Sequence, residues 1–326
     1  MRFQLLLTLG DLKSEASAGA RRTLLARDLT DEWIQLASLT AGEAPTSSDL
    51  RRASIELKGE GALGYLERMA SLLAAASSKE DVSQTIRSAA DGTPEMAAAM
   101  LEGVAEGLRR RQGERVDLSD EMGMLYQMFF NSEDAGFRQA VIALGRRTGA
   151  SSPSNARRAM DMAGADADPI KRVDMLHLVA IAGPEPFDSA VRDIIAERPD
   201  SRVEAAAVEV LARISPPDLA SYLLGAWAFL SREARDVSLN ALLSDNAGIA
   251  ELLDAVEVGV VNPEEIGWNR RVRLMQNDDE DVRARARGLL HVTDASREMV
   301  VRAYEPAAAD EGDSQAGQAV FFTACA

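Results

Sequence analysis

The chain has 326 residues, of which 46% are hydrophobic and 5% aromatic, and its 36 Lys and Arg against 52 Asp and Glu give a net charge of −16. This composition excludes general disorder, and the length exceeds what one hydrophobic core usually serves, so we expect two domains or an elongated repeat array. The negative charge argues against nucleic acid as a partner, because phosphate binding needs clustered Lys and Arg. Abundant Ala and Leu with few aromatic residues favour helices over sheets, and the predicted fold class is all-α.

Cysteine and histidine usage restricts the possible chemistry. The chain contains one cysteine, Cys325, and two histidines, His177 and His291. A single thiol excludes an internal disulfide and any zinc site with several cysteines, and two histidines provide few ligands for another metal centre. No nucleophile elbow or phosphate-binding glycine loop is present. We therefore expect no metal site and no enzyme, and we assign no catalytic residue.

Residues 1 to 40 are predicted to form a helical hairpin. Phe3, Leu6, Leu7 and Gly10 fall on one face at helical spacing and indicate an opening amphipathic helix. Acidic residues follow this run at once, which disfavours the alternative of a secretory signal. The run is also far shorter than the roughly 20 residues that a bilayer span needs, so no membrane-spanning segment is predicted.

Residues 41 to 130 are predicted to form an irregular helical block. The stretch from 41 to 64 carries several glycines among Ser and Thr and is the most loop-like part of the body. Methionines and aromatic residues recur at helical spacing between 122 and 130. Such a set suits a soft cofactor pocket or a core, and core filling is the preferred interpretation because flexible thioethers fill irregular gaps.

Helix boundaries are marked by capping residues and prolines. Thr93 followed by Pro94 predicts a helix start, since the hydroxyl caps exposed amides and proline suits the first helical position. Three arginines at 109 to 111 end that helix, where cations suit the negative end of the helix dipole. The same start signal recurs at Ser215 with Pro216 and at Asn262 with Pro263.

Residues 131 to 303 contain a recurring unit in which an arginine precedes an apolar helix face and an acid stands just ahead of the helix. The steps between these arginines are 30, 33 and 48 residues. This pattern resembles HEAT repeats, helical hairpins that stack into an α-solenoid in which an arginine can pair with the acid of the next repeat. An ordinary helical bundle is the alternative. The arginines are Arg172, Arg202, Arg235 and Arg283, and the acids are Asp168, Asp200, Glu233 and the run 278 to 281.

The last residues read GDSQAGQAVFFTACA. Asp313 or Ser314 can cap a short helix, which places Gly317, Phe321 and Cys325 on one face. The spacing resembles the first helix of c-type cytochromes, in which a glycine and an aromatic residue precede a Cys-x-x-Cys-His motif. Covalent haem attachment needs both thiols and the histidine, and the chain holds only the first cysteine. We expect a linker over 304–313, the start of a cytochrome c-like domain over 314–326, and no cofactor in the chain as it stands.

A wider resemblance covers residues 130 to 326 and, more loosely, the first part. The matching segments are Trp227 with Leu230, Ser231 and Arg235, 239–243, 252–257 with Gly259, Arg271, Leu274, Asp278, 282–286, Arg297, Val300, Tyr304, 312–313, Gly317, 320–321 and 325–326. The chain is similar there to the large planctomycete and verrucomicrobial haem-binding proteins, often called putative membrane-bound dehydrogenases. The resemblance implies a parent protein with a β-propeller, HEAT repeats and a C-terminal haem c domain, and a periplasmic or exported location. Neither the propeller nor the second cysteine nor the histidine is present in this chain.

These observations predict a non-catalytic helical scaffold that holds an electron-accepting haem domain in place within its parent protein. The expected partners are protein partners or neighbouring domains, and the negative charge predicts docking of basic partners that weakens as salt rises. A stand-alone HEAT scaffold, with Cys325 incidental, is the alternative from another class. A helical-repeat enzyme that depends on His177 or His291 is the third possibility.

Overall fold

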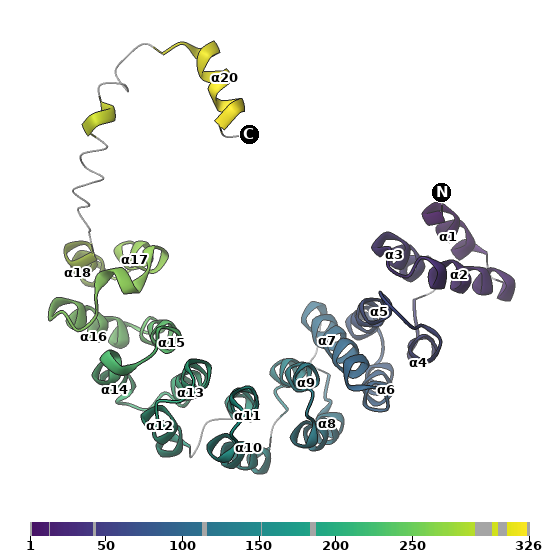
Figure 1. The fold of residues 1–326 in the computed structure, drawn as a ribbon, viewed down its shortest axis with the longest axis horizontal. Coiled ribbons are helices and arrows are strands. Elements are labelled where there is room, and N and C mark those ends of the chain that lie inside the picture. The colour runs from purple at the N-terminus through teal and green to yellow at the C-terminus, as the bar shows by residue number, and fades with distance from the viewer. Residues whose placement is uncertain are drawn as a thin grey trace. The chain divides into compact units, whose positions relative to one another are not determined.

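The computed structural model describes residues 2–12, 14–41, 44–112, 116–150, 152–182, 187–290, 302–305 and 312–324. Within these residues the chain forms helices and turns and no strand, which confirms the predicted all-α, helical-repeat fold (Figure 1). The chain divides into two compact units, Met1–Ala241 and Leu242–Ala326. None of the helices in the described ranges is long and apolar enough to cross a membrane.

The first unit opens with three helices that pack together: α1 (Arg2–Asp11), α2 (Glu15–Arg27) and α3 (Glu32–Thr40). The predicted opening helix is confirmed, but its buried face consists of Leu6 and Gly10, whereas Phe3 is 38% exposed. Gly10 is required because a Cβ there would lie 2.6 Å from the Cβ of Ala41.

A helix occupies the stretch that the sequence marks as most loop-like. Helix α4 (Ser47–Glu56) begins after Thr46, whose hydroxyl accepts the amide of Asp49 while the Asp49 carboxylate accepts the amide of Thr46. Leu50 anchors the helix and is fully buried. This capping box and one apolar anchor outweigh the surrounding glycines, which lie outside the helix.

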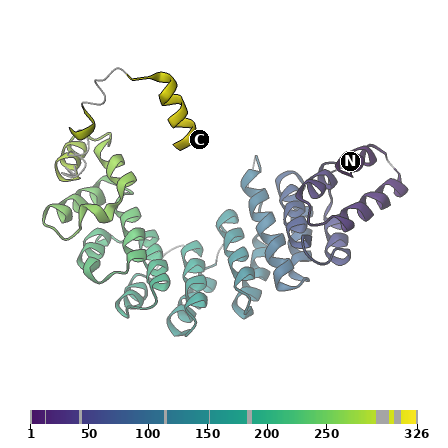
Figure 2. The same ribbon diagram turned by 45° about the horizontal axis from the view of Figure 1, so that its top comes forward.

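Most of the first unit consists of two rows of helices (Figures 1 and 2). In the first row, here called the odd row, each helix contacts the next. In the other row, α4 contacts α6, α6 contacts α8, and α10 contacts α12. The odd row comprises α5 (Ala62–Ala76), α7 (Pro94–Arg110), α9 (Ala135–Thr148), α11 (Pro169–Ala182) and α13 (Ser201–Ile214), and the even row adds α6 (Lys79–Ala90), α8 (Ser119–Asn131), α10 (Pro153–Ala165) and α12 (Asp188–Ala196) to α4.

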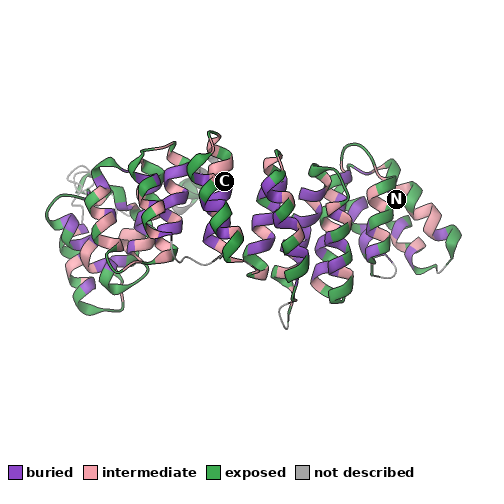
Figure 3. Cartoon of the chain, turned by 90° about the horizontal axis from the view of Figure 1, so that it is seen from below, coloured by how far each residue is buried: buried purple, intermediate pink, exposed green. Residues whose placement is uncertain are grey.

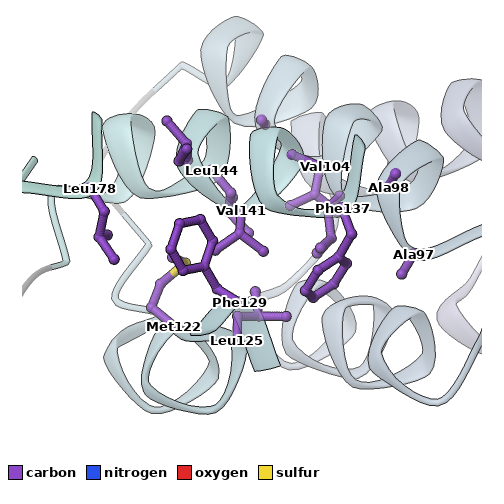
Figure 4. Packing of buried hydrophobic residues seen from close by; sticks show 14 of the residues in the cluster. Ala97, Ala98, Val104, Met122, Leu125, Phe129, Phe137, Val141, Leu144 and Leu178 are labelled. Atoms are coloured by element: carbon purple, nitrogen blue, oxygen red, sulfur yellow. The ribbon is translucent and has the colours of Figure 1, made fainter. Parts of the chain in front are cut away.

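The core lies between the two rows, and buried residues recur along the helices (Figure 3). Met122, Leu125 and Phe129 of α8 point toward Val141 of α9 in this core (Figure 4). Tyr126 is buried beside them, and its hydroxyl donates to the carbonyl oxygen of Ala150 at 2.6 Å. The methionine and aromatic residues of α8 therefore fill the core, as predicted.

The predicted helix starts have mixed outcomes. Thr93 caps α7 by accepting the amide of Met96, with Pro94 in the first turn, as predicted. Ser215 instead ends α13 in the left-handed region at φ 50°, and the prediction of a helix start at Pro216 is wrong because the chain turns through residues 216–218 before α14 (Leu219–Ala226) begins. Asn262 caps a short 3-10 helix, η2 (Pro263–Ile266).

The first unit ends with α14, the 3-10 helix η1 (Trp227–Phe229) and most of α15 (Arg232–Leu242). The second unit contains α16 (Asn246–Glu257), η2, α17 (Trp268–Met275), α18 (Glu280–Leu290) and α20 (Ser314–Ala324). Helix α18 contacts both α16 and α17. Arg285 of α18 donates to Asp254 of α16 at 2.5 Å, which ties these two helices at their surface.

Candidate interaction surface

Each helix of the odd row leaves one stripe of side chains exposed or partly exposed, and we call these stripes together the odd face. Its residues recur at helical spacing, so the stripes of successive helices lie beside one another wherever those helices are in contact. The odd face therefore offers one extended polar surface built on a packed layer. Its polar members include Glu67 and Arg68 of α5, Glu102 and Glu106 of α7, Gln139 and Arg146 of α9, His177 of α11, and Arg202 and Glu209 of α13.

Helices α5 and α7 approach each other so closely that backbone meets backbone. A Cβ placed on Gly103 would lie 2.1 Å from the carbonyl oxygen of Glu67, and one on Gly107 would lie 2.2 Å from that of Ser71. Only glycine allows this approach, because any side chain would collide with the opposite main chain. The contact fixes the stripes of α5 and α7 side by side.

This contact brings two unpaired carboxylates to the odd face. Within the described residues, neither Glu67 nor Glu102 has a hydrogen bond or ion pair to a cation. Partial burial raises the pKa of Glu102, and the charge of Glu67 raises it further. Glu106 differs, because hydrogen bonds from Arg109 lower its pKa to about 2.

A buried ion pair joins α9 to α11. Arg138 Nε donates to Asp174 Oδ2 at 2.7 Å, and both side chains are 2% exposed. The guanidinium also donates to the carbonyl oxygen of Ser132 at 3.0 Å. Burial raises the pKa of Asp174, and the hydrogen bond from Arg138 opposes that rise. The pair thus fixes how α9 and α11 align, because a shift would leave a buried charge without its partner.

The predicted pairing of an arginine with an acid of the next repeat occurs here, but the acid is Asp174 and not one of those expected from the sequence. The sequence pointed to acids ahead of the helix, such as Asp168, but Asp174 lies in the body of α11. Asp168 instead accepts the amide of Ile170 at 2.9 Å and so caps the helix. Arg138 itself was missed, although its spacing of four residues after the capping Asp134 matches that of Arg172 after Asp168.

The other repeat arginines bind the ends of neighbouring helices. Arg172 Nε donates to the carbonyl oxygen of Ala163 at 2.7 Å, and Arg235 Nε donates to that of Trp227 at 2.9 Å. Arg283 likewise binds the carbonyl oxygen of Asn277 at 2.6 Å, whereas Arg202 pairs with Asp200 at its own helix start. The three backbone contacts satisfy carbonyls near the end of the preceding helix, so these arginines hold each hairpin together.

His177 lies on the odd face between α9 and α13. Its Nε2 is 3.5 Å from Glu209 Oε2, and Arg146 Nη2 is 3.5 Å from Glu209 Oε1. The hydrogen bond from His177 lowers the pKa of Glu209. These contacts place the histidine beside the ion pair of Arg146 with Glu209, so side chains of three helices meet here. Within the described residues there is no group of three His, Cys, Asp or Glu side chains that could hold a metal ion.

A cavity of about 1050 Å³ lies among α1 to α5. Arg21 and Arg52 line it together with Asp49 and the buried Tyr65, whose pKa is raised by burial. The charges on its wall are of both signs, so it shows no single class of ligand. Its wall also contains residues on both sides of positions 42 and 43, which lie outside the described residues.

The predicted C-terminal helix is present as α20, and of the two predicted caps, Asp313 and Ser314, it is Asp313 that caps it. Its carboxylate accepts the amides of Gln315 at 2.8 Å and Ala316 at 3.1 Å. Val320 and Phe321 are 65% and 58% exposed. Cys325 and His291 lie outside the described residues, so the structure places neither.

No protein-family model, no curated protein and no solved structure matches this chain. The resemblance to the haem-binding family therefore stays a prediction from the sequence.

Proposed function

We propose that this chain is a non-catalytic helical-repeat scaffold that holds protein partners or neighbouring domains on its odd face. The observation that carries the proposal is the continuous contact from α5 to α13. Two of these contacts are reinforced within the layer, one by the glycines between α5 and α7 and one by the buried pair of Arg138 and Asp174 between α9 and α11. A layer built in this way keeps surface side chains at fixed separations, which is what a scaffold requires.

Site-specific photo-crosslinking tests this proposal. A benzophenone amino acid is placed at Gln139, which is exposed on α9 of the odd row, or at Gly123, which is exposed on α8 of the even row. After irradiation in the native host, the proposal predicts discrete protein adducts from position 139 and few from position 123. Equal adduct patterns from both positions, or none from either, would contradict it.

A more specific form of the proposal places the scaffold next to a haem domain in a periplasmic or exported parent protein. The supporting observation is α20, a helix that is capped by the acid Asp313 and on which Val320 is 65% exposed. The residues of this sequence do not suffice for haem c, because attachment needs two cysteines and a histidine and the chain contains one cysteine. The scaffold role therefore depends on no haem chemistry.

The nucleotide sequence after the codon for Ala326 tests this form directly. The haem form predicts a cysteine three positions after Cys325, followed at once by a histidine. A longer gene product should then retain covalent haem in a denaturing gel, and Cys325→Ala should weaken or abolish that haem signal. A stop codon directly after Ala326 would rule out the haem form and leave the stand-alone scaffold.

A further inference from the structure

Large apolar side chains are exposed next to the acidic part of the odd face. Trp33 and Leu36 of α3 are 70% and 41% exposed, and Leu63 of α5 is 42% exposed. Trp33 and Leu36 are three residues apart and share one stripe of α3, whereas Ile34 and Ala37 of the same helix are buried. The exposed stripe of α3 therefore carries two large apolar side chains, and α3 has a separate buried face that holds it in the fold.

Polar contacts place α3 directly beside α5. Arg68 Nη2 donates to Glu32 Oε1 at 2.6 Å, and Gln35 Nε2 donates to the carbonyl oxygen of Gly61 at 3.1 Å. The hydroxyls of Ser38 and Tyr65 are 3.4 Å apart. Since Gly103 and Gly107 hold α7 against the other side of α5, the stripes of α3, α5 and α7 are neighbours. We call Trp33, Leu36, Leu63, Glu67 and Glu102 the docking strip.

The charge still available on the docking strip is negative. Arg68, which follows Glu67 on α5, is already engaged by Glu32 and Gln35. Glu67 and Glu102 have no cationic partner within the described part of the chain, and each repels the other. A lysine or arginine brought between these carboxylates would remove that repulsion and complement both charges.

We propose that the docking strip binds a basic amphipathic helix of a partner protein. Apolar side chains on one face of that helix cover Trp33, Leu36 and Leu63, and its lysines or arginines meet Glu67 and Glu102. A large exposed aromatic residue with aliphatic neighbours is the kind of anchor that dominates protein interfaces, and the flanking acids select a basic partner over an acidic one. This inference rests on the proposed scaffold function and adds the location and chemistry of one partner site.

The test uses the whole chain and a fluorescein-labelled, helix-forming peptide of 18 residues in which leucines occupy one face and lysines the rest. Fluorescence anisotropy is measured at low and at high salt. The double variant Trp33→Ala/Leu36→Ala should weaken binding by about tenfold, because it removes the anchor. Glu67→Gln/Glu102→Gln should weaken binding at low salt and reduce its salt dependence, because it removes the charges that salt screens.

Matched controls separate the docking strip from general acidity. Trp268→Ala removes another tryptophan, 60% exposed on α17, and Glu251→Gln/Glu264→Gln removes two carboxylates of the second unit. Both controls should bind the peptide as the unchanged chain does. If the controls weaken binding as much as the strip variants, or if the strip variants bind normally with unchanged circular dichroism, the inference is wrong.

Two further outcomes separate this inference from the scaffold function. Normal crosslinking from position 139 together with unaffected peptide binding in the strip variants would overturn the docking strip and leave the scaffold in place. Sedimentation that shows a dimer of the unchanged chain, converted to monomer by Trp33→Ala/Leu36→Ala, would also overturn the inference, because a second copy would then cover the strip.

Discussion

The close approach of α7 to α5 at Gly103 gives the sharpest prediction for stability. Replacing Gly103 by alanine adds one methyl group, and that methyl would lie 2.1 Å from the carbonyl oxygen of Glu67 and 3.0 Å from the Cβ of Ala70. A carbon rarely approaches a carbonyl oxygen closer than about 3.3 Å, so α5 and α7 must separate by about 1 Å. The obstacle is main chain, which cannot move away by rotating a side chain.

The expected cost follows from two opposing effects. Overpacking a tight contact costs about 1–3 kcal/mol, and a backbone obstacle places Gly103→Ala toward the upper end. Alanine in a helix regains about 1 kcal/mol over glycine. We therefore expect the free energy of unfolding to fall by about 2 kcal/mol. Gly107→Ala should behave alike, because its Cβ would lie 2.2 Å from the carbonyl oxygen of Ser71.

Urea denaturation followed by circular dichroism at 222 nm measures this loss. Gly123→Ala is the matched control, because Gly123 lies inside α8 and its added Cβ would have no atom within 4 Å apart from its chain neighbours and the backbone of its own helix. That variant should be as stable as the unchanged chain or slightly more stable. If Gly103→Ala and Gly123→Ala have the same unfolding midpoint, the close contact between α5 and α7 is refuted.

Two further predictions concern ionic contacts. Asp174→Ala should lower the free energy of unfolding by about 3–5 kcal/mol because it leaves Arg138 buried without its partner, whereas Arg138→Leu/Asp174→Leu should recover most of that loss, and urea denaturation of both variants measures the difference. If the double variant is less stable than the single one, the buried pair does not act as described. The pKa of Glu209 is lowered below its usual 4.5 in the folded chain, so its contribution to stability is present above pH 4.5 and is lost as the pH falls further. Glu209→Gln should therefore flatten the decline of thermal stability below pH 4.5, and an unchanged pH profile would count against the contact with His177.

The sequence predicts the fold class and many helix boundaries because these depend on local chemistry. Thr93 before Pro94 identifies the start of α7, and Asp313 identifies the start of α20, since capping needs only neighbours along the chain. Helix α4 was missed because its single anchor, Leu50, is recognised only when it is buried by other helices. The helix start predicted at Ser215 and Pro216 is wrong because a serine followed by a proline can end a helix as well as begin one.

The contacts that build the odd face were harder to predict from the sequence. The glycines at 103 and 107 stand four residues apart on α7, but nothing in the sequence says that their partners are the main chain of Glu67 and Ser71. Arg138 and Asp174 are separated by 36 residues, and their pairing follows only once α9 and α11 are neighbours. The contact of His177 with Glu209 likewise depends on which helices meet.

Native-state hydrogen exchange of the whole chain tests the central claim, that the odd row is one continuously packed layer. Buried segments of α5, α7, α9, α11 and α13 should exchange slowly and with similar free energies of opening, since neighbouring helices support one another. Gly103→Ala should then speed exchange in both α5 and α7. Fast and unrelated exchange in adjacent odd-row helices would show that each helix opens alone, and that result would contradict the scaffold described above.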